Sequence, residues 1–392
     1  MPVARPPPTP GPAPTDRVRS YAGSVTKENF RFALLCGFAA FAAGLIMVMF
    51  ATAPYNGNLS ALVRMDPADS MAVDATSFDP SFAFVKDGHY DGVYAYTIAL
   101  DPFARGSFHN KIDYPAYRYG RAGYGWMARL FCFGKPALIP TVLVLLNLVG
   151  LAVAGFGASR LAVLFGWPAA SGIAVALNPG FLIGITLDTS EGFSAGLLVL
   201  ALLAWFREDR WVAVGLMAFL CLIKEPFIAV PLGLMVWEFA SRGKDAWRQR
   251  KGHLFSLAAA LVPLAVWWSY LSVRLGEWPF AQSWLVEKPV MGYLDTMMRS
   301  AQMAGDGIDV SQIAIPQLAF VLMIGLAFLF GIGHALRFRT PIDPIFLGFV
   351  GVFSILSWWQ LLYAKELFRI LAIPLMLLPA VLVGAPKRWR ST

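Results

Sequence analysis

The strongest constraint on this chain is a recurring apolar run that is long enough to cross a membrane. The first run, FALLCGFAAFAAGLIMVMFA at residues 32–51, contains no charged side chain. An α-helix rises about 1.5 Å per residue, so such a run matches the roughly 30 Å hydrocarbon core of a bilayer. Charged residues make up only 14% of the chain, whereas a soluble domain carries roughly 25%. The sequence therefore predicts an all-α, polytopic membrane protein.

Nine further apolar segments are predicted after the first. They lie near residues 137–158, 166–187, 191–206, 211–223, 227–240, 254–275, 315–335, 344–362 and 369–385. The two segments beside Lys224-Glu225-Pro226 are short, at roughly 20 Å of helix each, and do not reach across a hydrocarbon core. We therefore expect about ten spans, with a broken or tilted pair at Lys224.

The rest of the chain divides into a tail, one transmembrane domain and a long loop. Residues 1–30 include the proline-rich tract PVARPPPTPGPAP, which predicts a disordered tail and not a signal peptide, because the apolar run begins too late. Residues 31–392 are predicted to form a single domain, and residues 54–135 a partly helical outer loop. The cysteines are scattered and odd in number, which predicts buried thiols without a disulfide framework; they are Cys36, Cys132 and Cys221.

Lysine and arginine are distributed unevenly between the predicted loops. They concentrate in the tail, in SRGKDAWRQRKGH (241–253), in RFR (337–339) and in KRWR (387–390). Such loops are usually cytoplasmic, so the net charge of +8 does not indicate nucleic-acid binding. We expect a protein of the plasma (inner) membrane with both termini cytoplasmic, and with residues 54–135 on the extracytoplasmic side.

Polar clusters interrupt the apolar pattern at the predicted outer face. They comprise Asp87, Asp91 and Asp101 in KDGHYDGVYAYTIALDP (86–102), Asp188 and Glu191 in LDTSEG, the pair Lys224 and Glu225, and Lys365, Glu366 and Arg369 in YAKELFRI. Polar residues at membrane depth are costly and usually functional. Lys365 and Arg369 are four residues apart, so both can point the same way on a helix. We expect these clusters to converge on one outer cavity.

This combination of residue types suits sugar transfer outside the cytoplasm, where the donor is a lipid-phosphate sugar. A carboxylate takes a proton from the acceptor hydroxyl, and cations stabilise the departing phosphate. Aromatic rings stack on sugars, and an apolar groove holds the lipid tail.

Each cluster also has a structural interpretation. Asp87-x-His89-x-Asp91 is compatible with a metal site or with a solvated turn at Gly88 and Gly92. Asp188 and Glu191 suit the start of a helix. Lys224 and Glu225 suit an ion pair at a helix break, and Lys365 and Arg369 suit anchoring at the interface.

The stretch YDGVYAYTIALDP (90–102) resembles the Asp-Gly, Tyr and Ile-Ala signature that follows the first span of GT-C superfamily glycosyltransferases, especially the bacterial and GPI-anchor mannosyltransferase-like branch. A closer group of bacterial membrane proteins shares further motifs with this chain. These are DYPAYRYGR (113–121), NPG (178–180), DTSE (188–191) and KEP (224–226). One departure is Val93-Tyr94, where that group commonly has Gln-Phe.

The resemblance implies a GT-C-like fold, a lipid-linked donor and inversion at the sugar carbon without a metal or cofactor. By position in the motif, Asp91 is the expected general base, and Asp87, which lies outside the signature, is the second candidate. Lys224, Lys365 and Arg369 are expected at the phosphate. The other expected substrate-binding residues are Asp87, Tyr90, Tyr94, Tyr117, Arg118, Tyr119, Asp188, Glu191, Glu225 and Glu366.

The expected reaction moves a sugar, either mannose or a related hexose or pentose, from a polyprenyl-phosphate donor. The acceptor is a lipid-linked glycan, a cell-wall polymer or a protein. The alternative is a transporter or flippase of a lipid-linked sugar, which also uses broken helices and charges at membrane depth. A third possibility is a non-catalytic assembly partner that keeps the fold.

The first prediction concerns topology. A cysteine placed at Ser70 should react with a membrane-impermeant reagent added from outside, and one at Ser241 should not, because the basic loop is expected to be cytoplasmic. Labelling of intact cells, followed by labelling after lysis, measures this. Reaction at Ser241 alone would reverse the orientation and remove the case for a lipid-linked donor.

Overall fold

The chain folds into helices throughout the part that the structure describes. This computed structural model covers residues 27–242, 245–280, 286–305, 311–338, 340–361 and 364–384. Within these residues the only β-type pairing is one isolated bridge between Val286 and Leu356. The predicted all-α architecture is therefore confirmed, whereas the predicted disordered tail lies almost wholly outside the described residues.

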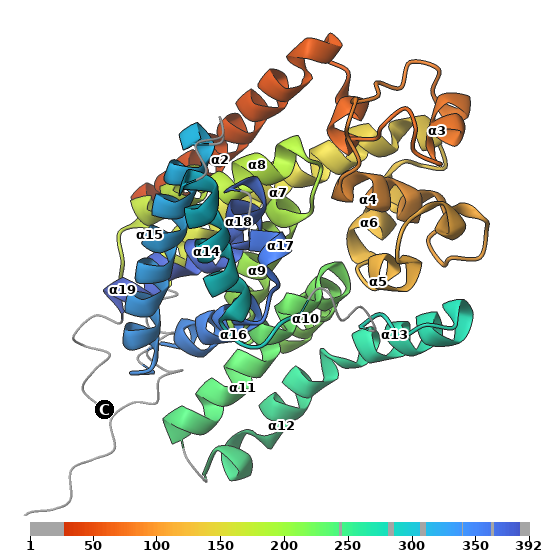
Figure 1. Ribbon diagram of the computed structural model, residues 1–392. Helices are drawn as coiled ribbons and strands as arrows, with labels where there is room; N and C mark the ends of the chain where they lie inside the picture. Colours follow the sequence, from red (N-terminus) through yellow and green to blue (C-terminus); the bar gives the residue numbers. More distant parts are fainter. Residues whose placement is uncertain are drawn as a thin grey trace, which may run out of the picture.

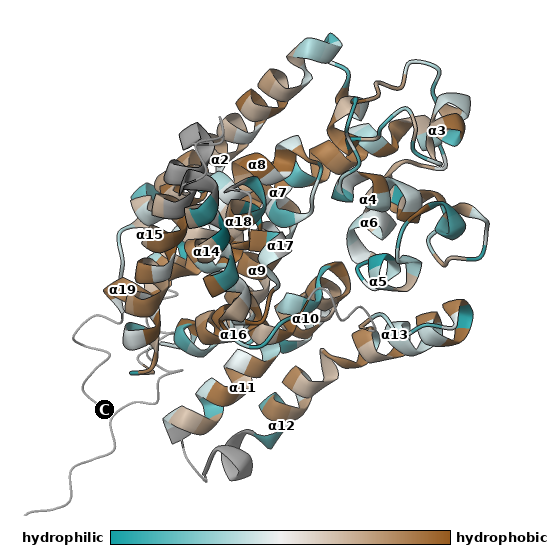
Figure 2. Ribbon diagram, viewed as in Figure 1, coloured by the Kyte–Doolittle hydropathy of each residue, from teal (hydrophilic) through white to brown (hydrophobic). Residues whose placement is uncertain are grey.

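Long and short apolar helices make up the body of the molecule (Figure 1). The α-helices of this body are α2 (Lys27–Thr52), α7 (Ile139–Leu164), α8 (Pro179–Thr186), α9 (Glu191–Phe206), α10 (Arg210–Ile223), α11 (Ala229–Arg242), α12 (Asp245–Ala259), α13 (Val262–Leu275), α14 (Met291–Gly305), α15 (Ser311–Ala335), α16 (Ile342–Ser354), α17 (Trp358–Leu361), α18 (Ala364–Ile370) and α19 (Ala372–Val383). Figure 2 shows hydrophobic residues along most of these helices.

Three helical stretches among the described residues are long and apolar enough to cross a membrane: Lys27–Tyr55, Pro136–Leu164 and Lys251–Leu275. A fourth candidate is the pair Ala169–Val175 and Pro179–Thr186, which bends by 43° at its break. The remaining predicted segments correspond to shorter apolar helices. Ten spans therefore remain a prediction, but each predicted apolar segment is helical over most of its length.

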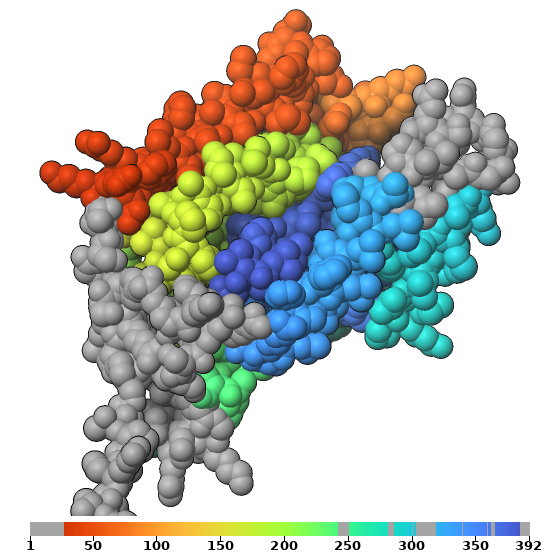
Figure 3. All heavy atoms as spheres, turned by 90° about the vertical axis from the view of Figure 1, so that its left-hand side faces the viewer, coloured from red at the N-terminus to blue at the C-terminus, as the bar shows by residue number. Residues whose placement is uncertain are grey.

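Besides the bent pair at 169–186, two of the later predicted segments are divided between separate helices. The segment predicted at 344–362 is wrong as one continuous helix, because α16 ends at Ser354 and α17 begins at Trp358. Between them the backbone pairs with another segment: Glu287 N donates to Ile355 O at 2.9 Å. The last predicted span, 369–385, is likewise divided at Leu371 between α18 and α19. On the face shown in Figure 3, α2, residues 169–186, α19 and α15 lie side by side in this order.

Residues 54–135, predicted to lie on the outer side and called the outer layer below, form a compact helical layer at one end of the body (Figure 1). Its α-helices are α3 (Ala72–Phe78), α4 (Asp91–Leu100), α5 (Pro115–Tyr119) and α6 (Gly123–Phe131). Buried Met65, Phe82 and Tyr96 belong to an apolar cluster that also includes Leu143 of α7, and this joins the layer to the body. The predicted partly helical loop is confirmed, and the three cysteines are buried and free, as expected.

Helix α7 lies at the centre of the body because small residues let its neighbours approach closely. It packs against α2 on one side and α9 on the other. A Cβ atom built at Gly150 would lie 2.4 Å from Phe193 Cα and 2.5 Å from Gly192 O. The backbones of α7 and α9 therefore touch at Gly150, as is common where membrane helices associate through small residues.

Gly150→Ala is expected to destabilise the protein, since the new methyl group must push α7 away from the α9 backbone. Overpacking of this kind costs about 1–3 kcal/mol. Gly215→Ala is the matched control, because a Cβ there meets nothing within 4 Å, and better helix propensity should raise stability slightly. Thermal unfolding in detergent measures both; a Gly150→Ala protein as stable as the Gly215→Ala protein would contradict the close crossing.

Candidate active site

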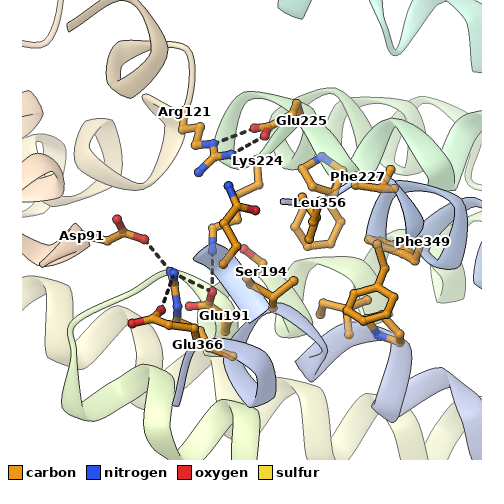
Figure 4. Close-up of a pocket in the computed structure, with 18 of the residues that line it drawn as sticks. Asp91, Arg121, Glu191, Ser194, Lys224, Glu225, Phe227, Phe349, Leu356 and Glu366 are labelled. Carbon is orange, nitrogen blue, oxygen red and sulfur yellow. Dashed lines mark hydrogen bonds and ion pairs between the residues drawn. The ribbon is translucent and has the colours of Figure 1, made fainter. Parts of the chain in front are cut away.

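A cavity of about 530 Å³ lies where the outer layer meets the body. One end of its lining carries four basic and four acidic side chains: Arg118, Arg121, Lys224 and Arg369, with Asp91, Glu191, Glu225 and Glu366. The other end carries Phe227, Phe349 and Leu356, and further apolar residues of the lining are Val352, Phe353, Ile370 and Ile373. Figure 4 shows both ends. The convergence expected from the sequence is thus seen for most of the polar clusters.

Asp91 occupies the first turn of α4 and projects into the charged end. The start of α4 lies directly against the backbone of Val63. Only glycine fits at position 92, because an added Cβ would lie 2.6 Å from Val63 O. One carboxylate oxygen of Asp91 accepts a hydrogen bond from Arg118 Nη1 at 3.2 Å, and the other accepts one from Arg369 Nη1. Burial opposes ionisation, but the two guanidiniums outweigh it and hold the pKa of Asp91 well below its usual range.

Arg369 of α18 is surrounded by carboxylates. Besides Asp91, its Nη2 donates to Glu366 Oε2 at 3.2 Å, and its Nη1 lies 3.7 Å from Glu191 Oε1. Glu366 also accepts a hydrogen bond from the Tyr90 hydroxyl. The last helices and the first outer loop are therefore joined through residues 278 positions apart in the sequence.

Lys224 and Glu225 lie at the predicted helix break, which is confirmed: α10 ends at Ile223 and Lys224 has extended backbone angles. They do not pair with each other. Lys224 Nζ donates to Glu191 Oε1, whereas Glu225 accepts two bonds from Arg121, one of them from Nε at 2.7 Å. The interpretation of Lys224 and Glu225 as a mutual ion pair is therefore wrong.

Asp188 lies beside this site in a separate buried network. Its backbone is left-handed, with φ +50°, and it precedes α9. Its Oδ1 accepts a hydrogen bond from the Tyr124 hydroxyl at 3.1 Å, and Asn147 Nδ2 donates to that hydroxyl at 2.7 Å. Glu191 is the first residue of α9, whereas Asp188 precedes the helix and lines a cavity of about 50 Å³ next to Asp91.

Tyrosines on α4 and α5 support the arginines. The Arg118 guanidinium lies 3.6 Å from the centre of the Tyr94 ring, and that of Arg121 lies 4.3 Å from the centre of the Tyr117 ring, which are cation–π distances. Burial raises the pKa of Tyr117 to about 12, so its phenol stays protonated at neutral pH.

Six predicted site residues lie outside the lining of the 530 Å³ cavity. Tyr94 and Asp188 line the smaller cavity beside it, and the Tyr90 hydroxyl donates to Glu366. The other three are Asp87, Lys365 and Tyr119. Asp87 is exposed, and Lys365 has a 56% exposed side chain whose ammonium lies 3.9 Å from Glu366 and 5.3 Å from the centre of the Tyr90 ring. Tyr119 is buried against α13, where its carbonyl accepts a hydrogen bond from Trp267 Nε1 at 2.8 Å. Their predicted contact with substrate remains a prediction without support from this geometry.

Other lining residues were not among those expected. Arg121 lies within the quoted DYPAYRYGR motif, so its charge next to Arg118 was the available signal. Tyr124, which lines the smaller cavity, and its partner Asn147 carried no signal, because a single tyrosine or asparagine in the sequence does not reveal its partner. The apolar end could not be located either, since Phe349 and Leu356 resemble any other membrane-facing residue in the sequence.

No protein-family model and no curated protein matches this chain. Among solved structures, two chains match. One is ArnT from Cupriavidus metallidurans in the apo state, with 20% sequence identity and a TM-score of 0.45. The match covers 77% of this chain and 56% of the ArnT chain, so this chain spans little more than half of the length of ArnT.

The ion pairs of Asp91 predict a pH-dependent contribution to stability. Because its folded pKa is lowered, the stabilisation is present above the unfolded value of about 4 and is lost as the pH falls towards the folded pKa. Asp91→Asn should therefore melt at a lower temperature than the wild type at pH 7, and the gap should narrow below about pH 4. Melting curves across this range test it; a gap that is absent at pH 7 would contradict the pairing.

Proposed function

We propose that this protein is a membrane glycosyltransferase of the GT-C kind that uses a polyprenyl-phosphate sugar. The sugar is mannose or a related hexose or pentose, and the acceptor is a lipid-linked glycan, a cell-wall polymer or a protein on the extracytoplasmic side of the inner membrane. One observation carries the proposal: Asp91, the expected base, is paired with Arg369, the expected phosphate ligand, in a cavity with one charged and one apolar end.

The cavity suits an amphipathic donor. The guanidinium of Arg369 and the ammonium of Lys224 both contact Glu191 Oε1, so one phosphate group is able to replace that carboxylate and reach both cations. Arginine binds phosphate through its planar fork and lysine as a point charge. Phe227, Phe349 and Leu356 then offer an apolar surface for the first isoprene units.

A second apolar cavity of about 540 Å³ adjoins the first at Arg121, Glu225 and Leu356. Its lining continues along α11 and α16 through Leu232, Val236 and Leu347. Together the two cavities provide a path for a polyprenyl chain that leads from the charged end along the helices.

Catalysis requires Asp91 to act as a general base. The acceptor hydroxyl loses its proton to the Asp91 carboxylate while its oxygen bonds to the anomeric carbon of the sugar. The bond from that carbon to the phosphate oxygen breaks, and polyprenyl phosphate leaves with the electron pair, stabilised by Arg369 and Lys224. Attack opposite the leaving group inverts the configuration at this carbon.

Donor binding prepares Asp91 for this role. In the unliganded site its two guanidinium partners lower its proton affinity, which makes it a weak base. A phosphate that engages Arg369 competes with Asp91 for the same donor groups. The proton affinity of Asp91 rises as that positive charge is shared, so the base becomes effective when the donor is in place.

Asp91→Asn should abolish most transfer, because the amide keeps the shape of the side chain and removes its basicity. Loss of a general base costs about 10²–10⁴ in rate. Transfer from a radiolabelled polyprenyl-phosphate sugar in membranes measures this, with unfolding followed separately. Asp87→Asn is the matched control and should lose less, since Asp87 is exposed. Near-normal transfer by folded Asp91→Asn would falsify the assignment, and an inactive Asp87→Asn beside it would move the base to Asp87.

A measurement of donor binding distinguishes the proposed role of Asp91 as general base from that of Arg369 as phosphate ligand. Asp91→Asn should still bind polyprenyl phosphate, whereas Arg369→Ala should bind it more weakly than Arg337→Ala, whose arginine is exposed beyond the end of α15. Equal binding by the two arginine variants removes Arg369 from the phosphate site. A wild-type protein that moves lipid-linked sugar across vesicles without transferring it would favour the flippase alternative.

A further inference from the structure

A chain of hydrogen bonds leads from the surface of the outer loop to Asp91. Asp69 Oδ1 lies 2.6 Å from His89 Nδ1, and His89 Nε2 lies 2.9 Å from the Tyr94 hydroxyl. Arg118 Nη2 donates to the same hydroxyl at 3.0 Å, and its Nη1 donates to Asp91 at 3.2 Å. The proposed reaction uses only the last of these links.

The backbone around His89 is held in a conformation that L-residues rarely adopt. His89 has φ +69° and Asp87 has φ +55°. The His89 N–H donates to Arg64 O at 2.5 Å, and the Asp87 N–H donates to Asp66 Oδ2 at 2.6 Å. Left-handed residues of this kind persist only where the surroundings hold them, and they cluster at functional sites. The fold therefore fixes the position of the His89 ring.

The direction of the hydrogen bonds follows from the chemistry of the partners. The Asp69 carboxylate only accepts, so Nδ1 of His89 carries a hydrogen, and in the neutral ring Nε2 accepts from the Tyr94 hydroxyl. When the ring takes up a proton, Nε2 becomes a donor, and the Tyr94 hydrogen must turn to another acceptor. Asp113 is the neighbouring acceptor, because its Oδ2 and the Tyr94 hydroxyl accept hydrogen bonds from the same Arg118 Nη2, at 3.1 Å and 3.0 Å.

Asp113 is also the second partner of Arg118. Its oxygens accept from Arg118 Nε at 3.3 Å and from Arg118 Nη2 at 3.1 Å. A Tyr94 hydroxyl that turns to Asp113 competes for these oxygens, and a cationic ring at His89 repels the guanidinium. Both effects change how Arg118 divides its hydrogen bonds between Asp113 and Asp91.

We propose that His89, oriented by Asp69, is a positioning residue whose proton sets the direction of the Tyr94 hydroxyl and thereby the hold of Arg118 on Asp91. This deepens the proposed function and rests on it, because Asp91 is the base there. The His89 side chain is 44% exposed, so its ring is accessible to solvent. The charged and titratable groups that face it are Asp69 and Tyr94, and through Tyr94 also Arg118, Asp113 and Asp91.

The coupling is measured without substrate, by following the titration of His89 with ¹⁵N-histidine NMR. Linkage is reciprocal: if the His89 proton changes the hold on Asp91, then Asp91→Asn must change the proton affinity of His89. Removal of the carboxylate should lower that affinity about twofold or more. In the Tyr94→Phe background most of this change should disappear. Lys86→Gln is the control, because exposed Lys86 acts only through space and its effect should be the same in both backgrounds.

An Asp91→Asn effect of the same size with and without Tyr94 would overturn the proposal, because the coupling would then be through space alone. The proposal is also overturned if Asp91→Asn leaves the proton affinity of His89 unchanged. Neither outcome depends on whether the protein transfers sugar, so failure of this proposal is distinct from failure of the proposed function.

Transfer kinetics give the second readout. His89→Gln should lower kcat by roughly ten- to a hundredfold, the scale expected for a misplaced catalytic group, with the KM for the donor unchanged and with the pH profile of kcat altered. Lys86→Gln should keep the wild-type kcat at the pH optimum, because its effect through space shifts the pH profile without moving any catalytic group. A folded His89→Gln protein with wild-type kcat at every pH would overturn the positioning role, and a wild type without transfer would count against the proposed function while the NMR comparison still decides the coupling.

Discussion

The structure depends on the mutual neutralisation of charges where the outer layer meets the apolar body. A buried charge without a partner is costly, and removal of one member of such a pair is strongly destabilising. Here Arg369 holds Asp91, Lys224 holds Glu191, and Arg121 holds Glu225. Because the pairs of Asp91 and Arg121 join residues 278 and 104 positions apart in the sequence, the contacts that neutralise these charges also attach α4 and the segment before α6 to the helical body.

The helical architecture was predictable because it depends on local properties of the sequence. In an apolar medium each segment must satisfy its own backbone hydrogen bonds, so an apolar run forms a helix whatever its neighbours do. The break at Lys224 was predictable for the same reason, since both flanking runs are too short to span. The break between Ser354 and Trp358 was not, because the pairing of Ile355 with Glu287 depends on a segment far away in the sequence.

The sequence was sufficient to predict which charged residues belong to the candidate site, but not which of them pair with each other. Charged residues in an apolar chain are conspicuous, and Asp91, Lys224 and Arg369 stood out in this way. Their partners depend on backbone direction: the extended conformation at Lys224 sends it and Glu225 to opposite sides, towards Glu191 and Arg121 respectively. Asp87 shows the opposite case, because it was expected in the site but has a left-handed backbone and an exposed side chain.

A charge-balanced site has a consequence for the order of events in the proposed reaction. Four cations and four carboxylates already neutralise one another in the lining of the cavity, so an anionic phosphate enters only by exchange for a carboxylate. Each exchange leaves a carboxylate with less positive charge nearby, which raises its proton affinity. Binding of the anionic donor and uptake of a proton are therefore linked in the same direction. The acceptor hydroxyl is the group that supplies this proton, so its deprotonation is favoured after the donor phosphate has bound and not before.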